Sequence, residues 1–469
     1  MSDVAPPEAA DRETALVRQP EYLRVLGIAG LLGVPVSLVA FGFLALLHES
    51  EHRLWHDLPH ALTGGDTPPW WWPLPLLALA GLGVGAVARW APGHGGHTPA
   101  DGMGGPPPTP AQLPWVLVAA LISLPLGAVL GPEAPLIAGG GGLALLAAHV
   151  FGIEPGSRPA MVVSGAGAAA AIAAIFGSPV VAAVLLIEMV QLSGAALSAV
   201  VIPCLLAAGV GSIVFTGLGL WSGLPIGTLN LPIPATPVRP DLGDLLWALP
   251  LAVVAAVGIR LVRGLAKSLA PRVAARPLEM TVLAALGVGA CAAAYGLITG
   301  RSPAEVALSG QQTLAAMAAD PTVWPEAALL VMVLCKGLGY ALSLAALRGG
   351  PIFPAVTLGG VLGVLAAPLP GFGAVPAMAA GMAAATVAML PLPVSAVVLV
   401  VLLLGPAGFS MTPVVLLATV VAFMTEQLVE HGLTRRRPAP PPPTPTPPSP
   451  SPATLKESRP PETPDAATL

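Results

Sequence analysis

Long apolar runs, separated by short polar breaks, dominate the chain from residue 22 to about residue 428. The first run covers residues 22–47, which exceeds the roughly 20 apolar residues that a membrane-spanning helix needs. Residues 189–238 and 349–425 contain no Asp, Glu, Lys or Arg. Stretches of that length predict several helices that fold back through a membrane.

Prolines lie within these apolar runs and not only between them. Proline ends or kinks a helix, and in lipid the freed backbone groups are tolerated only inside the protein or beside a water-filled cavity. Inward-pointing helix N-termini of this kind hold anions in many permeases. We therefore predict an all-α polytopic membrane protein of broken, tilted helices around an interior site. The prolines are Pro179, Pro203, Pro225, Pro354, Pro368, Pro370, Pro376, Pro391, Pro393, Pro406 and Pro413.

The apolar sequence divides into two blocks, which predict halves of one membrane domain (21–432) at about 21–222 and 241–432. A Pro-rich connector, residues 224–240, lies between them. Each block carries a Gly-rich motif followed by proline and a charge-free run, a pattern typical of inverted repeats. Residues 1–20 and the Pro-rich tail 433–469 predict disordered cytoplasmic ends.

Composition excludes other classes of protein. Only 9% of residues are charged, against about 25% in soluble domains. A net charge of −4 without a basic stripe argues against nucleic acid as a partner. By the positive-inside rule, the basic residues 435–437 after the last run place the C-terminus in the cytoplasm, and Arg18 and Arg24 beside the first run place the N-terminus there too. We expect the protein in the plasma (inner) membrane. Cys204, Cys291 and Cys335 stand alone in apolar sequence, as small core residues do.

Four segments carry candidate chemistry. The first, LGPEAPLIAGGGG at 130–142, places Glu133 between two prolines at an expected helix start. An ionisable group at membrane depth is a functional candidate by default. The alternative is an ordinary N-terminal helix acid at a water interface. The second segment, GGPIFP at 349–354, offers the backbone donors of Ile352 and Phe353 at another helix start; a turn packed against lipid is the alternative.

The third segment, PGHGGHTPADGM at 92–103, contains His94 and His97. Two histidines without a third ligand are weak evidence for a metal, and we interpret them as turn or interface residues. The fourth, SPVVAAVLLIEM at 178–189, ends in Glu188, which either pairs inside the bundle or reaches the cytoplasmic surface. We expect no metal, no cofactor and no catalytic residue.

Together these segments resemble the CLC family of chloride channels and chloride/proton exchangers. That family carries a Gly-Ser-Gly-Ile-Pro turn, a Gly-Arg/Lys-Glu-Gly-Pro turn, an apolar helix ending in Glu and a Gly-x-Phe-x-Pro turn. Residues 131–135 read GPEAP, and LIAGGG, SPVVAAVLLIE and GGPIFPAVTLGGVLG follow in the family's order. Lys336 falls where many members place a basic residue. The resemblance covers about residues 22–430.

The resemblance implies a homodimer in membrane lipid, with one pathway for chloride or other small anions in each subunit. Glu133 matches the gating glutamate, and Glu188 matches the first acid of the family's Glu-Glu pair, in a proton-handling or structural role. The anion would be held by the turns around these positions: Gly95, Gly96, His97, Thr98, Pro99, Gly131, Ala134, Pro135, Gly350, Ile352, Phe353 and Pro354.

Several positions depart from the family pattern. The turn at 95–99 lacks the usual serine hydroxyl, Pro132 and Ala134 replace Arg/Lys and Gly, and Pro351 has no N–H to donate. At the segment of the pore tyrosine stand Gly408 and Phe409, neither with a hydroxyl. Met189 occupies the place of the second acid, which favours a voltage-gated-channel-like pathway over tight proton exchange.

Three alternatives remain open from the sequence. One is a proton-coupled anion exchanger of the same fold, and another is a secondary transporter of a different fold. The third is a membrane-embedded hydrolase, for which Ser164 in the sequence Val-Ser-Gly is the nearest approach to a nucleophile. The histidines His149 and His431 lack a suitable context for that chemistry.

Overall fold

The computed structural model describes residues 19–103, 105–190, 195–223, 230–233 and 239–434. Within these ranges the chain forms helices joined by turns, and no strand longer than an isolated bridge occurs in them. The prediction of an all-α protein is therefore confirmed. Most of the two expected disordered ends and of the connector 224–240 lies outside the described residues.

The first half of the chain contains eight described α-helices. They are α2 (Pro20–His52), α3 (Leu58–Thr63), α4 (Pro73–Trp90), α5 (Leu113–Ser123), α6 (Glu133–Val150), α7 (Arg158–Phe176), α8 (Pro179–Val190) and α9 (Ala195–Ser222). A π-helical turn, Arg53–Asp57, joins α2 to α3 without a break. The short 3-10 helices η2 (Pro92–Gly95) and η3 (Pro99–Asp101) lie between α4 and α5.

The second half contains α10 (Leu242–Ala275), α11 (Pro277–Thr299), α12 (Gln311–Ala319), α13 (Glu326–Ala346), α14 (Ile352–Ala366), α15 (Ala374–Met389), α16 (Pro393–Leu403) and α17 (Gly408–Thr434). Its 3-10 turns are η4 (Pro303–Glu305), η5 (Pro321–Val323) and η6 (Gly405–Ala407). The chain separates into two units, Met1–Gln427 and Leu428–Leu469. Everything below concerns the first unit; the described part of the second continues α17 to Thr434.

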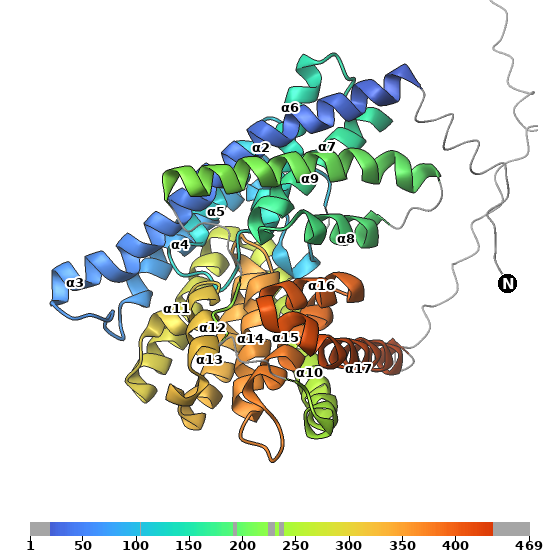
Figure 1. The fold of residues 1–469 in the computed structure, drawn as a ribbon. Helices are drawn as coiled ribbons and strands as arrows, with labels where there is room; N and C mark the ends of the chain where they lie inside the picture. Colours follow the sequence, from blue (N-terminus) through green and yellow to red (C-terminus); the bar gives the residue numbers. More distant parts are fainter. Residues whose placement is uncertain (1–18, 104, 191–194, 224–229, 234–238, 435–469) are drawn as a thin grey trace, which may run out of the picture. The chain divides into compact units, whose positions relative to one another are not determined.

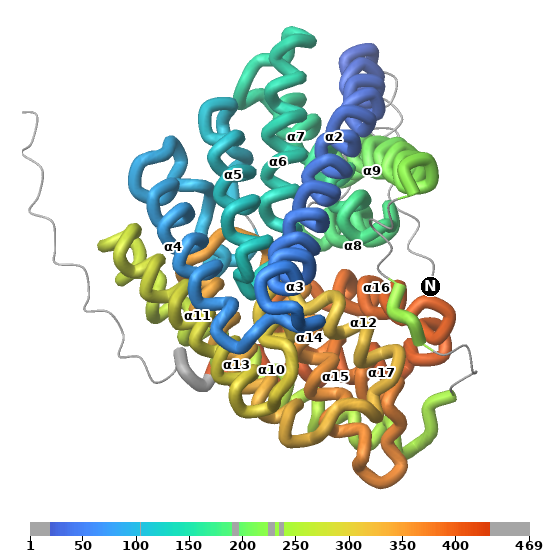
Figure 2. Tube along the Cα trace, turned by 90° about the vertical axis from the view of Figure 1, so that its left-hand side faces the viewer, coloured from blue at the N-terminus to red at the C-terminus, as the bar shows by residue number. Residues whose placement is uncertain are grey.

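Helices of the same half pack mainly on one another. Figures 1 and 2 show α2, α6, α7 and α9 side by side, with α10, α13, α14 and α15 gathered in a second group. The halves are joined by α4, which packs along α11, and by α8, which packs against α16. Small residues make this close packing possible: a methyl at Gly140 would lie 2.5 Å from the Gly167 carbonyl oxygen, which ties α6 to α7.

The prolines only partly break the helices as predicted. Pro179 and Pro393 begin α8 and α16, and Pro354 and Pro376 lie in the first turns of α14 and α15, where a missing N–H costs nothing. Pro203 and Pro413, in contrast, lie inside the long helices α9 and α17. At those two positions the prediction of a broken helix is wrong, because the flanking helical turns extend across the lost hydrogen bond.

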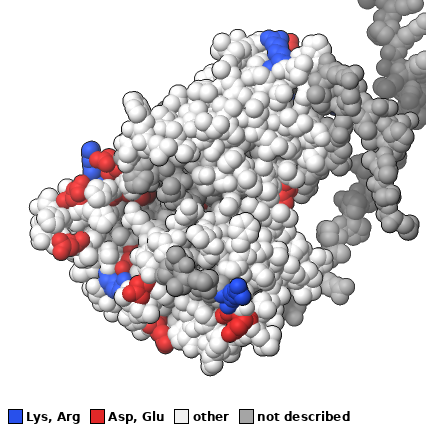
Figure 3. Space-filling model, in the orientation of Figure 1, with Lys and Arg blue, Asp and Glu red and all other residues white. Residues whose placement is uncertain are grey.

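The described helices suit a membrane. Nine of them are long and apolar enough to cross one, and many of their large apolar side chains face outward, including Leu261, Ile213 and Leu334 at 70% or more exposure. Figure 3 shows a face that is almost free of charge, with the acidic and basic residues confined to a few places. The chain is an integral membrane protein. Cys204 and Cys291 are buried in it, and Cys335 is half-buried.

Candidate functional site

Two Gly-rich turns that are far apart in the sequence meet inside the protein. The Gly131 N–H donates to the Gly350 carbonyl at 2.8 Å, and the Gly350 N–H donates back to the Gly131 carbonyl at 2.5 Å. Each turn leads directly into a helix, α6 at Glu133 and α14 at Ile352. The pairing therefore brings two helix N-termini, with their unpaired backbone donors, to one interior place.

Two buried serines hold these turns, and each accepts a hydrogen bond from a backbone N–H of the other half of the chain. Ser343, on α13, accepts a hydrogen bond from the Val129 N–H at 3.1 Å. Ser123, at the end of α5, accepts one from the Arg348 N–H at 3.2 Å. Thus α5–turn–α6 and α13–turn–α14 each hold the other's turn, as two repeats related by a two-fold axis do.

Glu133 fills the space between the two helix starts. Its side chain is fully buried, and its Oε1 accepts a hydrogen bond from the Phe353 N–H at 2.8 Å. The other oxygen, Oε2, has no partner among the described residues. The alternative of an exposed helix acid at a water interface is therefore wrong. A carboxylate at the N-terminus of α14 occupies a place that suits any small anion.

Both turn glycines are needed for this arrangement. A methyl group built on Gly131 would lie 2.6 Å from the Glu133 Cδ, and one on Gly350 would lie equally close to it. The Gly350 methyl would also approach the Ala134 nitrogen at 2.9 Å. The backbone must come this close to the carboxylate, so a turn that faces lipid is excluded for GGPIFP.

We expect Gly350→Ala to lower the thermal stability of the protein and its anion flux, because the new methyl displaces the Glu133 carboxylate. The stability loss should be smaller when Glu133→Ala is already present, since the clashing group is then gone. Thermal unfolding of the two single variants and the double variant in detergent measures this coupling. Purely additive losses would show that Gly350 does not contact Glu133.

Tyr340 supports the start of α14 and was not identified from the sequence. It is fully buried on α13, and its hydroxyl donates to the Pro351 carbonyl oxygen. Pro351 itself has no N–H, as the sequence indicated. The ring of Phe353 packs against that of Phe176 at 5.6 Å between centroids. Tyr340 and Phe176 therefore fix the backbone that offers the Phe353 amide to the carboxylate.

A cavity of about 760 Å³, here called the Arg348 cavity, opens on one side of the paired turns. Ala134 and Pro135, which follow Glu133, line it, and so does Gly349. The turn at 93–98 contributes the opposite wall. Three of the four candidate segments from the sequence thus come together around one cavity.

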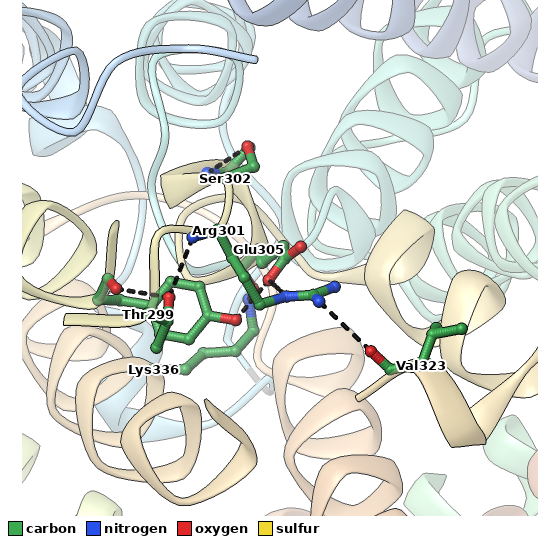
Figure 4. A network of polar contacts seen from close by, with 8 residues as sticks. Thr299, Arg301, Ser302, Glu305, Val323 and Lys336 are labelled. Atoms are coloured by element: carbon green, nitrogen blue, oxygen red, sulfur yellow. Dashed lines mark hydrogen bonds and ion pairs between the residues drawn. The ribbon is translucent and has the colours of Figure 1, made fainter. Parts of the chain in front are cut away.

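A second cavity of about 520 Å³, the Arg301 cavity, is lined by Leu130 and Pro132, which precede Glu133. Figure 4 shows the polar network beside it, in which Arg301 Nε lies 3.0 Å from Glu305 Oε2. Lys336 is fully buried on α13, and its Nζ donates to the carbonyls of residues 305–308 at 3.0–3.4 Å. Lys336 therefore holds the loop that forms this cavity's wall.

The two cavities lie at opposite ends of α11. Pro277 and Thr281, at its start, line the Arg348 cavity, whereas Arg301, just past its end, lines the other. A helix of 23 residues spans about 34 Å, close to the roughly 30 Å of a hydrocarbon core. Pro132 and Ala134, the residues on either side of Glu133 in the chain, therefore line different cavities.

The histidines of the turn at 92–103 are engaged by backbone. His94 Nδ1 lies 2.8 Å from the Ala88 carbonyl oxygen, and His97 Nε2 lies 3.0 Å from that of Gly102. Across the described ranges, no group of three or more His, Cys, Asp or Glu residues has the spacing of a metal site. The interpretation as turn histidines agrees with these contacts.

Glu188 lies away from the Arg348 cavity and caps another helix. Its Oε1 accepts from the Val394 N–H at 2.9 Å, and its Oε2 accepts from the Ser395 N–H at 2.8 Å and the Ser395 hydroxyl at 2.6 Å. It therefore closes the N-terminus of α16. Its neighbour Met189 lines a separate cavity of about 270 Å³, here called the Met189 cavity.

We expect Glu188→Ala to destabilise the protein by about 1–2 kcal/mol, the usual cost of losing a helix N-cap, with little change in anion flux. Three donors of α16 would lose their acceptor. Ser395→Ala, which removes only the hydroxyl contact, should cost less. Thermal unfolding and efflux on the same preparations measure both effects. A loss of flux without a loss of stability would instead indicate a role for Glu188 in transport.

The expected anion-binding positions lie either around the Glu133 carboxylate or along the walls of two cavities. Gly131, Gly350 and Phe353 surround the Glu133 carboxylate, with Ile352 and Pro354 buried in the first turn of α14. The remaining positions line cavities: Gly95, Gly96, His97, Thr98, Ala134 and Pro135 the Arg348 cavity, and Pro99 the Met189 cavity. Phe409, from the segment of the pore tyrosine, is 87% exposed and contributes to neither place.

Comparison with known proteins identifies a family. The sequence model of the family described as "Voltage gated chloride channel" matches residues 79–427. The "Putative ion-transport protein YfeO" of Escherichia coli (strain SE11) is 29% identical over 340 residues, which cover 71% of this chain and 77% of that protein. Its namesake in Salmonella paratyphi A is 33% identical over 158 residues. That match spans only 37% of the relative's length.

Solved structures share the fold. The crystal structure of a CLC-type fluoride/proton antiporter superposes with a TM-score of 0.62 at 18% identity, covering 87% of this chain and 97% of that one. That of a slow cyanobacterial Cl⁻/H⁺ antiporter superposes with a TM-score of 0.67 at 20% identity, covering 88% and 99%. These likenesses confirm the predicted fold of broken helices.

Proposed function

Because the chain belongs to the voltage gated chloride channel family, we propose that it carries small inorganic anions, chloride among them, across a membrane. The pathway connects the Arg348 cavity to the Arg301 cavity past Glu133. The chain works as a transport protein and not as an enzyme, and needs no cofactor. The solved structures of the same fold include antiporters, so a proton-coupled exchanger is the second candidate.

One observation carries the proposal: Glu133 accepts the Phe353 N–H, and its neighbours in the chain, Pro132 and Ala134, line the two different cavities. A helix N-terminus binds an anion through its unpaired amides and dipole. A pendant carboxylate at such a place competes with a diffusing anion for the same donors. Glu133 therefore acts as a gate, open when its side chain leaves the Phe353 amide.

The protein acts as a homodimer in the plasma (inner) membrane, with both termini in the cytoplasm. Apolar side chains that face outward on α8 and α9, among them Ile187, Ile202 and Leu205, offer a surface for a second copy or for lipid. The basic residues 435–437, on which the orientation depends, lie outside the described residues.

Anion efflux from liposomes tests the proposal. The full chain is reconstituted into vesicles loaded with chloride, and efflux is followed with a chloride electrode after a potassium ionophore removes the electrical barrier. We expect efflux above that of protein-free vesicles, and none of a large anion such as gluconate. Efflux no faster than in protein-free vesicles, at any pH between 4 and 8, would overturn the proposal.

A further inference from the structure

Arg348 is a buried cation that the pathway described above leaves without a role. It lies in the turn between α13 and α14, directly before Gly349 and two residues before Gly350. Only 9% of its surface is exposed, and its side chain lines the Arg348 cavity. The cavity is the larger of the two that flank Glu133.

The guanidinium has only neutral partners. Its two terminal nitrogens donate to the His94 carbonyl at 3.1 Å and the Leu347 carbonyl at 3.3 Å. Among the described residues, no carboxylate lies within ion-pair distance of it. Its Nε is buried and donates to no acceptor in those residues. The side chain therefore has both an uncompensated charge and an unused donor.

An arginine stays charged at all physiological pH values. Burying a charge without a counter-ion is costly. Removing one partner of a buried ion pair, for example, typically costs several kcal/mol. The other buried or half-buried arginines of the described chain are compensated: Arg260 and Arg263 contact Glu426 at 3.0 and 2.9 Å, and Arg301 contacts Glu305. Arg348 alone among these four faces a cavity with no acid to balance it.

The Arg348 cavity has room for a small anion, but not beside Nε. Gly93, Gly95 and Gly96 all have positive φ, and their turn also brings His94, His97 and Thr98 to the cavity wall. A methyl on Gly95 would lie 3.7 Å from Arg348 Nε but only 3.0 and 3.1 Å from carbons of Val87 and Ala119, so Nε lies in packed surroundings. Asp101 is the acidic residue that lines the same cavity, and it makes no ion pair with Arg348. An anion in the cavity can therefore meet the guanidinium only through its terminal nitrogens.

We propose that the Arg348 guanidinium, through its terminal nitrogens, binds a small monovalent inorganic anion in the Arg348 cavity before that anion reaches the Phe353 amide. This inference rests on the proposed function and assigns a binding group to it. The guanidinium replaces donors that this chain lacks, because the turn at 95–99 has no hydroxyl at its second position and Pro351 has no N–H. The positive charge of Arg348 also raises the local concentration of anions in the Arg348 cavity, at one end of the pathway.

Chloride binding to the full-length protein in detergent tests this, measured by isothermal titration calorimetry and by the chloride-dependent rise in melting temperature. Hydrogen bonds to a charged group contribute about 1.5–3 kcal/mol, so Arg348→Gln should weaken chloride binding by at least about tenfold. It should also lose most of the chloride-dependent stabilisation. The matched control is Arg272→Gln, an exposed arginine on α10 that donates to its own helix at Ser268; chloride affinity should stay within twofold.

A structural role for Arg348, in which it only holds the turn at His94, predicts a different result. In that case Arg348→Gln lowers the melting temperature equally with and without chloride, and chloride affinity in the folded fraction stays within twofold of wild type. Either finding would overturn the proposal. If Arg348→Gln does not fold, Arg348→Lys keeps the charge and removes the planar guanidinium; we expect at least a threefold loss of affinity, and unchanged affinity contradicts the role of the guanidinium.

The proposed transport function and the Arg348 binding site can be disproved independently of each other. If wild-type vesicles show no anion efflux, the proposed function is wrong. If wild type transports chloride and Arg348→Gln transports it with unchanged concentration dependence, the pathway stands and the Arg348 site is wrong. Efflux measured over a range of chloride concentrations therefore supplies a readout for each.

Discussion

Replacing Glu133 with alanine is expected to raise chloride efflux from liposomes at neutral pH by about tenfold. The carboxylate accepts the Phe353 N–H at 2.8 Å, and the residues before and after Glu133 line the two cavities. A hydrogen bond to a charged group contributes about 1.5–3 kcal/mol, so removing this competitor frees the site for chloride by a factor of that order. Efflux by wild type and variant at equal protein density measures the change.

The same experiment at several pH values tests the gating mechanism. In wild type, protonation neutralises Glu133, which then competes less well for the Phe353 amide, so efflux should rise as pH falls. Glu133→Gln keeps the size of the side chain and an oxygen that can accept the amide, but it cannot titrate. Both Glu133→Gln and Glu133→Ala should therefore show flat pH profiles, with the glutamine variant slower than the alanine variant.

Glu188→Gln serves as the control. Glu188 is an acid that caps α16 and lines neither the Arg348 cavity nor the Arg301 cavity. Its pH profile should follow that of wild type. A gate at Glu133 is excluded if Glu133→Ala and wild type conduct equally and respond equally to pH. Equal amounts of protein in the membrane, checked by size-exclusion chromatography before reconstitution, make the rates comparable.

Much of the site could be predicted from local sequence. Pro132 and Pro351 each stand just before a helix start, and both α6 and α14 begin at the next residue. Proline and glycine act through their own backbone, so their effect is visible in a short window. The same reasoning failed at Pro203 and Pro413, where packing against neighbouring helices supports a continuous helix and decides the outcome.

The parts that escaped prediction depend on contacts between distant segments. Ser343 accepts from Val129, more than 200 residues away in the chain. Tyr340, near the end of α13, donates to Pro351 in the turn that follows, a contact that depends on how this turn folds back. A serine or tyrosine in an apolar run carries no mark of such a partner. Arg348, in contrast, did carry a signal in the sequence. It stands directly before a Gly-Gly turn, and the 77 residues between it and Glu426 contain no other charged residue. Charged residues at membrane depth mark transport pathways.

Glu188 shows how adjacency in sequence can mislead. The resemblance placed it beside the position of a proton-relaying acid, one residue away. On a helix a shift of one residue turns a side chain by about 100°, and here that turn carries the carboxylate to the N-terminus of α16. Both of its oxygens accept hydrogen bonds there. A carboxylate whose two oxygens close a helix end is fixed in place, which suits a structural role and not proton relay.

A chloride gradient across proteoliposomes is expected to drive little or no uphill proton movement. Tight exchange needs one proton acceptor toward each side of the membrane, and Glu133 can serve as only one of them. Met189 lines its cavity with a thioether, which neither holds nor releases a proton near neutral pH. Arg263 and Lys267 line the same cavity, and their positive charges disfavour a proton there.

The measurement uses a pH electrode on vesicles with a tenfold chloride gradient and no initial pH gradient. Wild type should acidify or alkalise the medium no faster than Glu133→Ala, because neither completes a relay to the other side. Proton movement that vanishes in Glu133→Ala and keeps a fixed ratio to chloride flux would establish a coupled exchanger. In that outcome the fold and the anion pathway stand, and Asp101, which also lines the Met189 cavity, or water carries the proton there, and not Met189 or Glu188.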